Sequence, residues 1–312
     1  MDLTQTCQFL DDAQGKGLRT VLVTVCGVEG SSMRNPGTIM GVAEDGSFAG
    51  SLSGGCIENA VVSEALEVLA QGGPRIVRFG AGSPYLDIKL PCGGGLDVAF
   101  HVIEDAAFAA SCCASIEARE PFSIATGARG AAHLAEWREA WFDADTGEAV
   151  FGHYPGPHLQ IIGHGAGVEA LALLASAYGC TVRILTPDKR LIEQLAARAI
   201  DALCLDRTDQ TSLLQSDRWT ATVFLFHDHD WEIDLMQSAL SMPHFYIGAM
   251  GGRRAHAFRT EALMQRGASA EKLVSIRAPI GLFHSSRDPQ TLALSTLAEI
   301  IRAYEETSWT AD

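Results

Sequence analysis

The first third of the chain alternates short apolar segments with glycine-rich turns. Residues 18–28 form a dense run of β-branched side chains, which predicts a buried strand. Residues 38–55 predict two further strands around a tight turn, and residues 56–70 carry apolar side chains at helical spacing. Three more strand patterns lie at 74–80, 86–90 and 96–103. We therefore expect a compact N-terminal α+β domain over residues 1–105.

Residues 106–157 have a less regular pattern. An alanine-rich segment predicts a helix, and strand-like segments at 121–127 and 140–153 include a hairpin around Asp145-Thr146-Gly147. We expect this stretch to be a connector that completes the first domain and its sheet.

From residue 158 onward, apolar strand patterns alternate with helical ones. The strands are predicted at 158–163, 181–187, 220–228 and 244–250, and the helices at 165–179, 190–199, 232–242, 255–266 and 291–304. This alternation is typical of a parallel, doubly wound sheet. The predicted fold class is therefore α/β, with the N-terminal α+β domain followed by a Rossmann-like domain over residues 158–312.

Composition narrows the range of partners. Of the 312 residues, 47% are hydrophobic and 20% are charged, as in ordinary globular proteins. Asp and Glu number 38 against 23 Lys and Arg, and a net charge of −15 disfavours nucleic acid and anionic membrane surfaces. The sequence has no apolar run of 18 residues and no secretory signal at its N-terminus. We expect a cytoplasmic protein.

Cysteine usage argues against a disulfide scaffold and against structural zinc. The eight cysteines are few for a chain of this length, and no Cys-x-x-Cys pair occurs. We therefore expect reduced cysteines and no metal site. For six of the eight we expect packing roles: Cys7, Cys26, Cys112, Cys113, Cys180 and Cys204.

The other two cysteines lie beside glycine runs. Cys56 follows Gly54-Gly55 at the start of a predicted helix, where free N–H groups and the helix dipole favour a thiolate. Cys92 precedes Gly93 and Gly94, which allow the backbone to approach a bulky or anionic ligand. The shared chemistry predicts a single ligand site. The alternative is that both cysteines are small residues in tight turns.

A glycine turn opens the second domain. Gly163 and Gly165 follow its first strand and precede a helix, where backbone N–H groups can meet a phosphate. Val168 occupies the slot of the third glycine, however, and Thr186 stands where an acid would bind a ribose, with Asp188 two residues late. The pattern predicts a Rossmann-like fold and only weak binding of NAD(P).

Polar residues follow a later strand of the second domain. His227, Asp228 and His229 are possible ligand contacts, because ligands collect at the carboxyl ends of strands in such sheets. Two histidines without a firm third ligand make a weak metal site, and the alternative is a hydrogen-bonded strand end. Glu58 and Glu299 lie in predicted helices, where we expect solvated acids rather than catalytic ones.

The next strand ends in paired glycines and paired arginines. Gly251 and Gly252 precede Arg253 and Arg254, and guanidinium groups bind phosphate in a fork. This pattern predicts a phosphate cradle. The alternative is a surface turn with solvated arginines.

Together these segments resemble the xanthine dehydrogenase accessory proteins of the XdhC/CoxI type. In the first domain the matching stretches are VEGSSMRNPGTIMGV, SLSGGCIENAVVSEALEVL and LPCGGGLDV. In the second they are the glycine turn, FLFHDHD, YIGAMGGRRAH, APIGL and TLALSTLAEI. The order of SGGC, PCGGG and YIGAMGGRR is far more specific than the glycine turn alone.

The resemblance implies a maturation factor without turnover of its own. Such proteins bind the molybdenum–molybdopterin cofactor, protect it during sulfuration by a cysteine desulfurase, and deliver it to an apo molybdenum hydroxylase of the xanthine dehydrogenase or aldehyde oxidoreductase type. A cofactor nucleotidyltransferase and a second copy in a homodimer are further implied partners. The implied cofactor-binding residues are Gly54, Gly55, Cys56, Cys92, Gly93, Gly94, Gly163, Gly165, Gly251, Gly252, Arg253 and Arg254.

The sequence also departs from the family pattern. Ala166-Gly167-Val168 stands where His-Val-Ala is usual, and Thr186 replaces an Asp. The segment Arg287-Asp288-Pro289 resembles the subgroup whose cofactor carries cytidine dinucleotide. The nucleotide form therefore stays open, and so do two alternative functions: an NAD(P)-dependent oxidoreductase and a non-catalytic nucleotide-binding scaffold.

Overall fold

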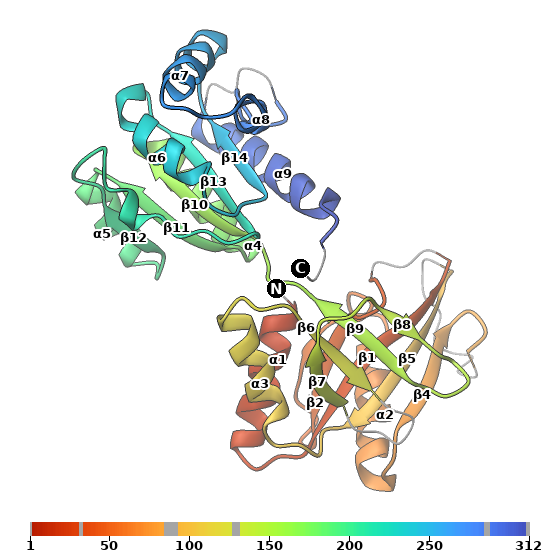
Figure 1. Cartoon of the computed structure of the whole chain (residues 1–312). Coiled ribbons are helices and arrows are strands. Elements are labelled where there is room, and N and C mark those ends of the chain that lie inside the picture. The colour runs from red at the N-terminus through yellow and green to blue at the C-terminus, as the bar shows by residue number, and fades with distance from the viewer. Residues whose placement is uncertain (1, 31–33, 84–92, 127–131, 284–287, 310–312) are drawn as a thin grey trace. The chain divides into compact units, whose positions relative to one another are not determined.

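The chain divides into two compact units, Met1–Pro155 and Gly156–Trp309, which are described separately below. The computed structural model describes residues 2–30, 34–83, 93–126, 132–283 and 288–309 (Figure 1). Within these ranges no helix is both long enough and apolar enough to cross a membrane.

The first unit is built on a five-stranded antiparallel sheet (Figure 1). Its strands are β1 (Thr20–Glu29), β2 (Ile39–Ala43), β3 (Phe48–Gly50), β4 (Arg75–Gly80) and β5 (Gly95–Val102), in the spatial order β3-β2-β1-β5-β4. Helix α2 (Glu58–Gln71) covers one face of this sheet. Its residues Val61, Ala65 and Val68 share a buried core with Val23 and Val25, alternate residues of β1 that face the helix.

A second sheet and two helices cover the opposite face. Strands β6 (Phe122–Thr126), β7 (Ala132–Glu136), β8 (Trp141–Phe142) and β9 (Ala149–His153) pair antiparallel in the order β7-β6-β9-β8. Helices α1 (Asp2–Gly15) and α3 (Phe108–Glu117) share a core with β6. The hairpin predicted around residues 145–147 is confirmed, because β8 and β9 pair across it.

The expectation that residues 106–157 add strands to the first sheet is wrong. The edges of that sheet are already formed by β3 and β4. Instead, the apolar side of the second sheet stacks on a buried face of the first sheet, where Phe151 packs with Cys26 and Ala99. Burying this side between two sheets removes more apolar surface from water than edge pairing would.

Helix α1 is an element that the sequence patterns did not predict. Its buried stripe consists of Thr6, Cys7, Leu10 and Ala13, which is small and partly polar. Such a stripe gives little apolar periodicity. The strand predicted at 86–90 lies outside the described residues.

The second unit contains a five-stranded parallel sheet, which confirms the predicted fold class. Its strands are β10 (His158–Gly163), β11 (Thr181–Thr186), β12 (Asp201–Cys204), β13 (Thr220–Leu225) and β14 (Tyr246–Ala249), in the order β12-β11-β10-β13-β14. The helices are α4 (Ala166–Tyr178), α5 (Lys189–Ala196), α6 (Ile233–Ala239), α7 (Arg253–Gln265), α8 (Ala270–Ser275) and α9 (Pro289–Glu306), with short 3₁₀ turns η1 (Thr211–Leu213) and η2 (His229–Trp231). The strand order reverses between β10 and β13, and in such sheets ligands bind outside this switch point.

Helices cover both faces of the parallel sheet (Figure 1). Leu159 and Ile161 of β10 pack with α4, α5 and α9, whereas Ile162 packs on the face of α6, α7 and α8. Val168, in the slot of the third glycine, is fully buried in the α4 core, so the helix accommodates its side chain.

Most of the cysteines expected to pack do so. Four of them are buried, namely Cys7, Cys26, Cys112 and Cys180, while Cys113 and Cys204 are half-buried. Burial raises the pKa of the Cys26 and Cys180 thiols to about 12, which keeps them protonated at neutral pH.

Candidate functional site

The loops after β1, β3 and β4 leave the same edge of the first sheet. These three strands run parallel to one another, because each is separated from the next by one antiparallel neighbour. The loop after β3 carries Cys56, and the loop from β4 to β5 carries Cys92. Cys92 lies outside the described residues, so its predicted role stays a prediction.

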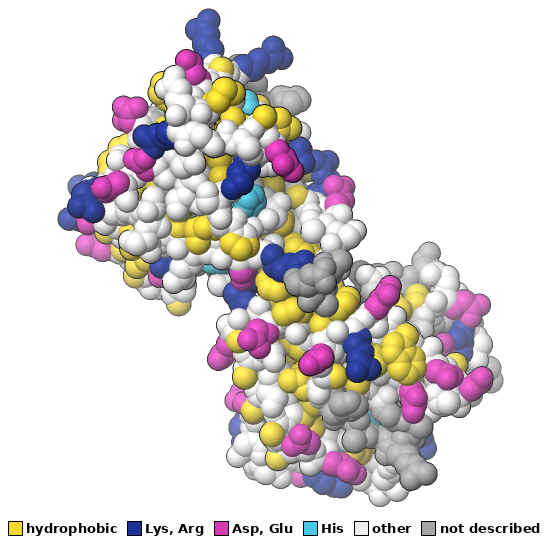
Figure 2. All heavy atoms as spheres, viewed as in Figure 1, with side chains coloured by type: hydrophobic (Ala, Val, Ile, Leu, Met, Phe, Trp, Pro, Cys, Tyr) yellow, Lys and Arg dark blue, Asp and Glu magenta, His cyan; other side chains and the backbone are white. Residues whose placement is uncertain are grey.

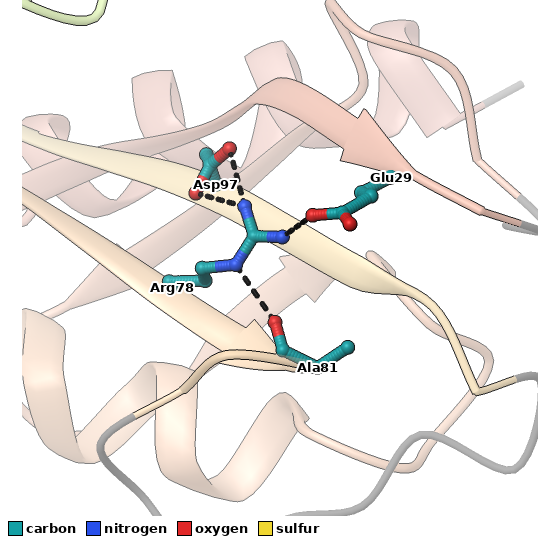
Figure 3. A network of polar contacts seen from close by, with 4 residues as sticks. All are labelled: Glu29, Arg78, Ala81 and Asp97. Carbon is teal, nitrogen blue, oxygen red and sulfur yellow. Dashed lines mark hydrogen bonds and ion pairs between the residues drawn. The ribbon is translucent and has the colours of Figure 1, made fainter.

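An arginine joins three strands at this edge (Figure 3). Nη1 of Arg78 in β4 donates to both carboxylate oxygens of Asp97 in β5, each at 3.0 Å. Its Nε donates to the Ala81 carbonyl at 2.7 Å, and Nη2 pairs with Glu29 at the end of β1. The ends of the loop that carries Cys92 are therefore held by charge-assisted contacts. The only signal for this network in the sequence is a pair of charged residues, Arg78 and Asp97, inside predicted strands.

Two glycines at this end of the sheet lie close to neighbouring segments, and close packing requires glycine at Gly95. A Cβ at Gly95 would lie 2.7 Å from Nη2 of Arg78 and 2.8 Å from the Ala81 carbonyl. A Cβ at Gly30 would lie 3.4 Å from the Cα of Gly94, so the loops after β1 and before β5 are in contact. By contrast, Gly93 has a φ of +71° and open space where a Cβ would be. This segment can therefore approach a ligand closely.

Glu58, the first residue of α2, organises the loop 51–57. Its Oε1 accepts hydrogen bonds from the Ser51 hydroxyl at 2.8 Å and from the backbone N–H of Leu52 and Ser53 at 3.1 and 3.0 Å. Its Oε2 accepts the Ser53 hydroxyl at 2.9 Å and the Ile57 N–H at 3.1 Å. Burial raises the pKa of this carboxyl, but the bonds from Ser53 and Ser51 outweigh burial and lower the pKa to about 2.

The expectation of a solvated acid is wrong for both helix glutamates that the sequence singled out. Glu58 is only 6% exposed, and its carboxylate accepts hydrogen bonds from the loop 51–57. Oε2 of Glu299, in α9, accepts the Tyr246 hydroxyl at 2.8 Å and the Gly281 N–H at 2.6 Å. Its carboxylate therefore links the end of the parallel sheet to the loop before α9.

Cys56 is exposed at the tip of the loop that Glu58 holds. Helix α2 begins at Glu58, so Cys56 precedes the helix by two residues. The N–H groups of Leu52, Ser53 and Ile57 donate to Glu58, and the Cys56 N–H donates to the Ser53 hydroxyl at 3.0 Å. The anion that these backbone N–H groups bind is therefore the Glu58 carboxylate.

The glycines before Cys56 leave its surroundings open. Gly54 and Gly55 have φ values of +80° and +114°, which glycine adopts without strain. A Cβ at either position would meet nothing within 4 Å. A bulky ligand can therefore reach the Cys56 thiol.

In the second unit, the glycine turn lies at the switch point between β10 and β13. A Cβ at Gly163 would lie 2.6 Å from the Leu225 carbonyl, so only glycine lets these two strand ends approach. Gly165, with a φ of +86°, precedes α4 and faces open space. The close approach brings His164 and His227 together, with ring centroids 6.0 Å apart.

His164 is a candidate residue that the sequence analysis did not select. Its position directly after β10 was the available signal, because strand ends at a switch point face the ligand crevice. The Asp228 carboxylate accepts the Asp230 N–H at 3.1 Å and so shapes the turn that follows. The side chain of His229 lies outside the described part of the structure. Among the described side chains, no three His, Cys, Asp or Glu residues are grouped so that they could hold a metal ion.

The arginine pair begins helix α7. Gly251 has a φ of +118°, and Gly252 precedes the helix with open space where a Cβ would be. Arg253 and Arg254 are exposed, and neither has an ion-pair or hydrogen-bond partner within the described ranges. Basic side chains project at the end of this unit that holds α7 (Figure 2).

The charges at the start of α7 are unfavourable for the helix itself. A helix N-terminus carries a partial positive charge, which favours acids in the first turn, yet α7 has no acid there and two arginines. This arrangement is stabilised when an anion binds, because the free N–H groups and both guanidinium groups then have a partner.

The end of β11 lacks a ribose-binding acid. Thr186 is fully buried, and its hydroxyl accepts the Asp188 N–H at 3.2 Å. Oδ1 of Asp188 accepts the N–H groups of Arg190 and Leu191 at 3.0 and 3.3 Å, and so caps α5. Asp188 is therefore used by the helix.

The fold defines a protein that joins an antiparallel α+β unit to a Rossmann-type unit. A family model described as "XdhC and CoxI family" matches residues 13–80, and one described as "XdhC Rossmann domain" matches residues 159–300. The chain is 33% identical over 304 residues to the "Molybdenum cofactor insertion chaperone PaoD" of Escherichia coli K12, covering 96% of this chain and 88% of that protein. The chain therefore belongs to the XdhC and CoxI family, which confirms the resemblance drawn from its motifs.

Two further similarities extend over most of the chain. The "Uncharacterized protein YqeB" of Escherichia coli K12 is 22% identical over 288 residues, which cover 88% of this chain and 41% of that protein. A crystal structure from Bacillus halodurans, described as a xanthine dehydrogenase, superposes with a TM-score of 0.77 at 21% identity, covering 99% of this chain and 98% of that one. At this identity, the structural similarity shows the fold alone.

Proposed function

We propose that this protein is a chaperone that binds the molybdenum–molybdopterin cofactor as cargo and delivers it to an apo molybdenum hydroxylase. The family and the similarity to a molybdenum cofactor insertion chaperone support this function. The observation that carries the proposal is the exposed arginine pair at the start of α7, which fits the phosphate of such a cargo.

We propose that the first unit supplies a thiol contact for the cargo. Cys56 is exposed beside two open glycines, and its loop is held by Glu58 before any ligand arrives. A preorganised loop loses little conformational entropy on binding. We infer that Cys56, together with Cys92 and its glycines Gly93 and Gly94, retains the molybdenum–pterin part of the cargo.

We propose that the Rossmann-type unit supplies a phosphate contact for the cargo. Gly163 and Gly165 shape the switch point, and Gly251 and Gly252 present the first turn of α7 with Arg253 and Arg254. The net charge of −15 repels free anions, so local cations are needed to attract a phosphate. We propose that His227 and Asp228, which follow β13, line the same carboxyl end of the parallel sheet.

We also propose partners, a nucleotide form of the cargo, a location and an oligomeric state for this chaperone. A cysteine desulfurase would sulfurate the cargo while it is held, and a nucleotidyltransferase would supply its nucleotide, with cytidine dinucleotide as the form to test first. We propose that the protein acts in the cytoplasm, as a homodimer, and without turnover of its own. An NAD(P)-dependent oxidoreductase is disfavoured because Asp188 caps α5 and Thr186 is buried.

Mass spectrometry of the purified protein tests the proposal. The protein would be produced in a host supplied with molybdate and purified without oxygen, and the bound small molecules would be released and identified. The expected result is a pterin with molybdenum and a phosphate or nucleotide group. A protein that carries nicotinamide dinucleotide, or no pterin at all, would contradict the proposal.

A further inference from the structure

Arg259 and Glu232 form an ion pair inside the Rossmann-type unit. Nε of Arg259 donates to Oε2 of Glu232 at 2.7 Å, and both side chains are 0% exposed. Arg259 lies in α7, which carries Arg253 and Arg254 at its start. Glu232 directly precedes α6 and follows the turn that carries His227 and Asp228. The pair therefore joins the segments after β13 and β14.

Arg259 also holds the start of the arginine loop. Its Nη2 donates to the Met250 carbonyl at 2.8 Å. Met250 is the residue between β14 and Gly251, and its own N–H donates to the Phe224 carbonyl of β13 at 2.9 Å. One planar guanidinium thus fixes both the carboxylate before α6 and the carbonyl before Gly251, which a point charge such as ammonium cannot do at once.

Stability alone is a weak reason for this arrangement. Removing two charges from water costs free energy, and replacing a buried ion pair with apolar side chains of similar size is often neutral or stabilising. The surroundings are apolar, since Phe226, Ile233 and Leu263 lie in the core on this face of the sheet. What an apolar pair would lack is the directed contact to the Met250 carbonyl.

We propose that Arg259 and Glu232 are positioning residues for the anion site. They hold the turn with His227 and Asp228 at a fixed distance from the first turn of α7, so that a phosphate meets a preformed edge. The inference rests on the proposed function only for the nature of the anion. The mechanical link between the two loops stands on the observed contacts.

The test compares two ion pairs that join the same helices. Arg259→Met combined with Glu232→Leu removes the buried pair and fills its space with apolar side chains. The control combines Arg266→Met with Asp234→Leu, which removes the exposed pair between Arg266, directly after α7, and Asp234, in the first turn of α6. Calorimetry with inorganic pyrophosphate measures the anion affinity of each full-length protein. Thermal unfolding and hydrogen exchange of segments 227–232 and 250–254 are measured in parallel.

The buried-pair variant is expected to unfold cooperatively near the wild-type midpoint and to bind pyrophosphate about tenfold more weakly or worse. Amide exchange in both segments should be faster than in the control, which should bind pyrophosphate like the wild type. Wild-type affinity in the buried-pair variant would overturn the inference. If that variant does not fold, Arg259→Lys replaces it, since it keeps the cation but loses the fork. Full affinity in Arg259→Lys would likewise overturn the inference.

Failure of the proposed function gives a different result. If the wild-type protein does not bind pyrophosphate, the anion assignment of the arginine pair is wrong. The exchange data then decide the positioning role by themselves. Unchanged exchange in both segments of the buried-pair variant would overturn it.

Discussion

The backbone N–H of Ser53 donates to the carboxylate of Glu58 at 3.0 Å. In the same loop, the Ser51 hydroxyl also donates to Glu58, and the N–H groups of Gly54 and Cys56 donate to the hydroxyls of Ser51 and Ser53. The loop therefore keeps one shape and exposes the Cys56 thiol at its tip. A carboxylate at the start of α2 is also favoured by the helix dipole.

Glu58→Gln is expected to lower the free energy of unfolding by about 1.5–3 kcal/mol, because an amide NH₂ then faces backbone donors in a buried site. Urea denaturation at pH 7 measures this loss. The matched control is Glu67→Gln in the same helix, where the exposed carboxylate pairs with Arg75 and contributes less. Equal losses in both variants would mean that Glu58 has no special role in the loop.

The stabilising contribution of Glu58 is expected to depend on pH. Its pKa is lowered from 4.5 to about 2 in the folded protein, so the contribution is complete above pH 4.5 and is lost as pH falls through 2. The difference in unfolding free energy between wild type and Glu58→Gln should therefore shrink from pH 5 to pH 2. A difference that stays constant over this range would contradict the assignment of the low pKa.

Cofactor retention is expected to depend on the two cysteine loops. Cys56→Ala and Cys92→Ala should each lower the molybdenum–pterin content of the purified protein while leaving its fold intact, because neither change removes a contact of the described core. Molybdenum analysis and circular dichroism measure the two effects. Cys204→Ala, a change at a half-buried thiol of the other unit, is the control. Full retention in the double variant would contradict the prediction.

NAD(H) is expected to bind weakly or not at all. The end of β11 offers the buried Thr186 in place of an acid, and Asp188 is engaged in capping α5. Loss of one charge-assisted hydrogen bond costs about 1.5–3 kcal/mol, or roughly ten- to a hundredfold in affinity. Titration calorimetry checks this expectation. A low-micromolar dissociation constant would show that the interpretation of the turn is wrong.

Arg253→Ala combined with Arg254→Ala is expected to weaken binding of pyrophosphate and to make the remaining binding less sensitive to salt, because two phosphate-pairing charges are lost. Calorimetry at low and high ionic strength measures both effects. Arg190→Ala combined with Arg198→Ala, which changes two arginines in and after α5, serves as the control. An unchanged affinity in the Arg253 and Arg254 variant would show that these two arginines do not form an anion site.

The sequence predicted the parts of the fold that depend on regular apolar patterns. In the second unit, β10, α4, β11 and β13 lie where alternation and helical spacing placed them. The order of the strands does not follow from this pattern, because right-handed crossovers allow several doubly wound orders, and the order here reverses between β10 and β13. Helix α1 was missed because its buried stripe contains Thr6 and Cys7, whose side chains give no clear apolar signal.

The sequence predicted which residue types form the candidate site, but only some of the contacts that these residues make. The glycines before Cys56 and before Arg253 predicted loops that a ligand can approach closely. Gly55 and Gly251 do have positive φ values, which glycine adopts without strain. The partners of Glu58 and Arg259 could not be predicted. Glu58 binds the N–H of Ser53, five residues away, and Arg259 binds Glu232, 27 residues away. Both contacts depend on burial, which the local sequence pattern does not show.

We propose that this protein acts on another enzyme by supplying its cofactor. The direct measurement is to purify the target molybdenum hydroxylase from a strain that lacks this protein, and to determine both its activity and its molybdenum content. We expect a hydroxylase that is expressed but inactive, with a deficit of correctly sulfurated cofactor that the wild-type chain restores. Normal activity with full cofactor occupancy in the deletion strain would rule out the chaperone function.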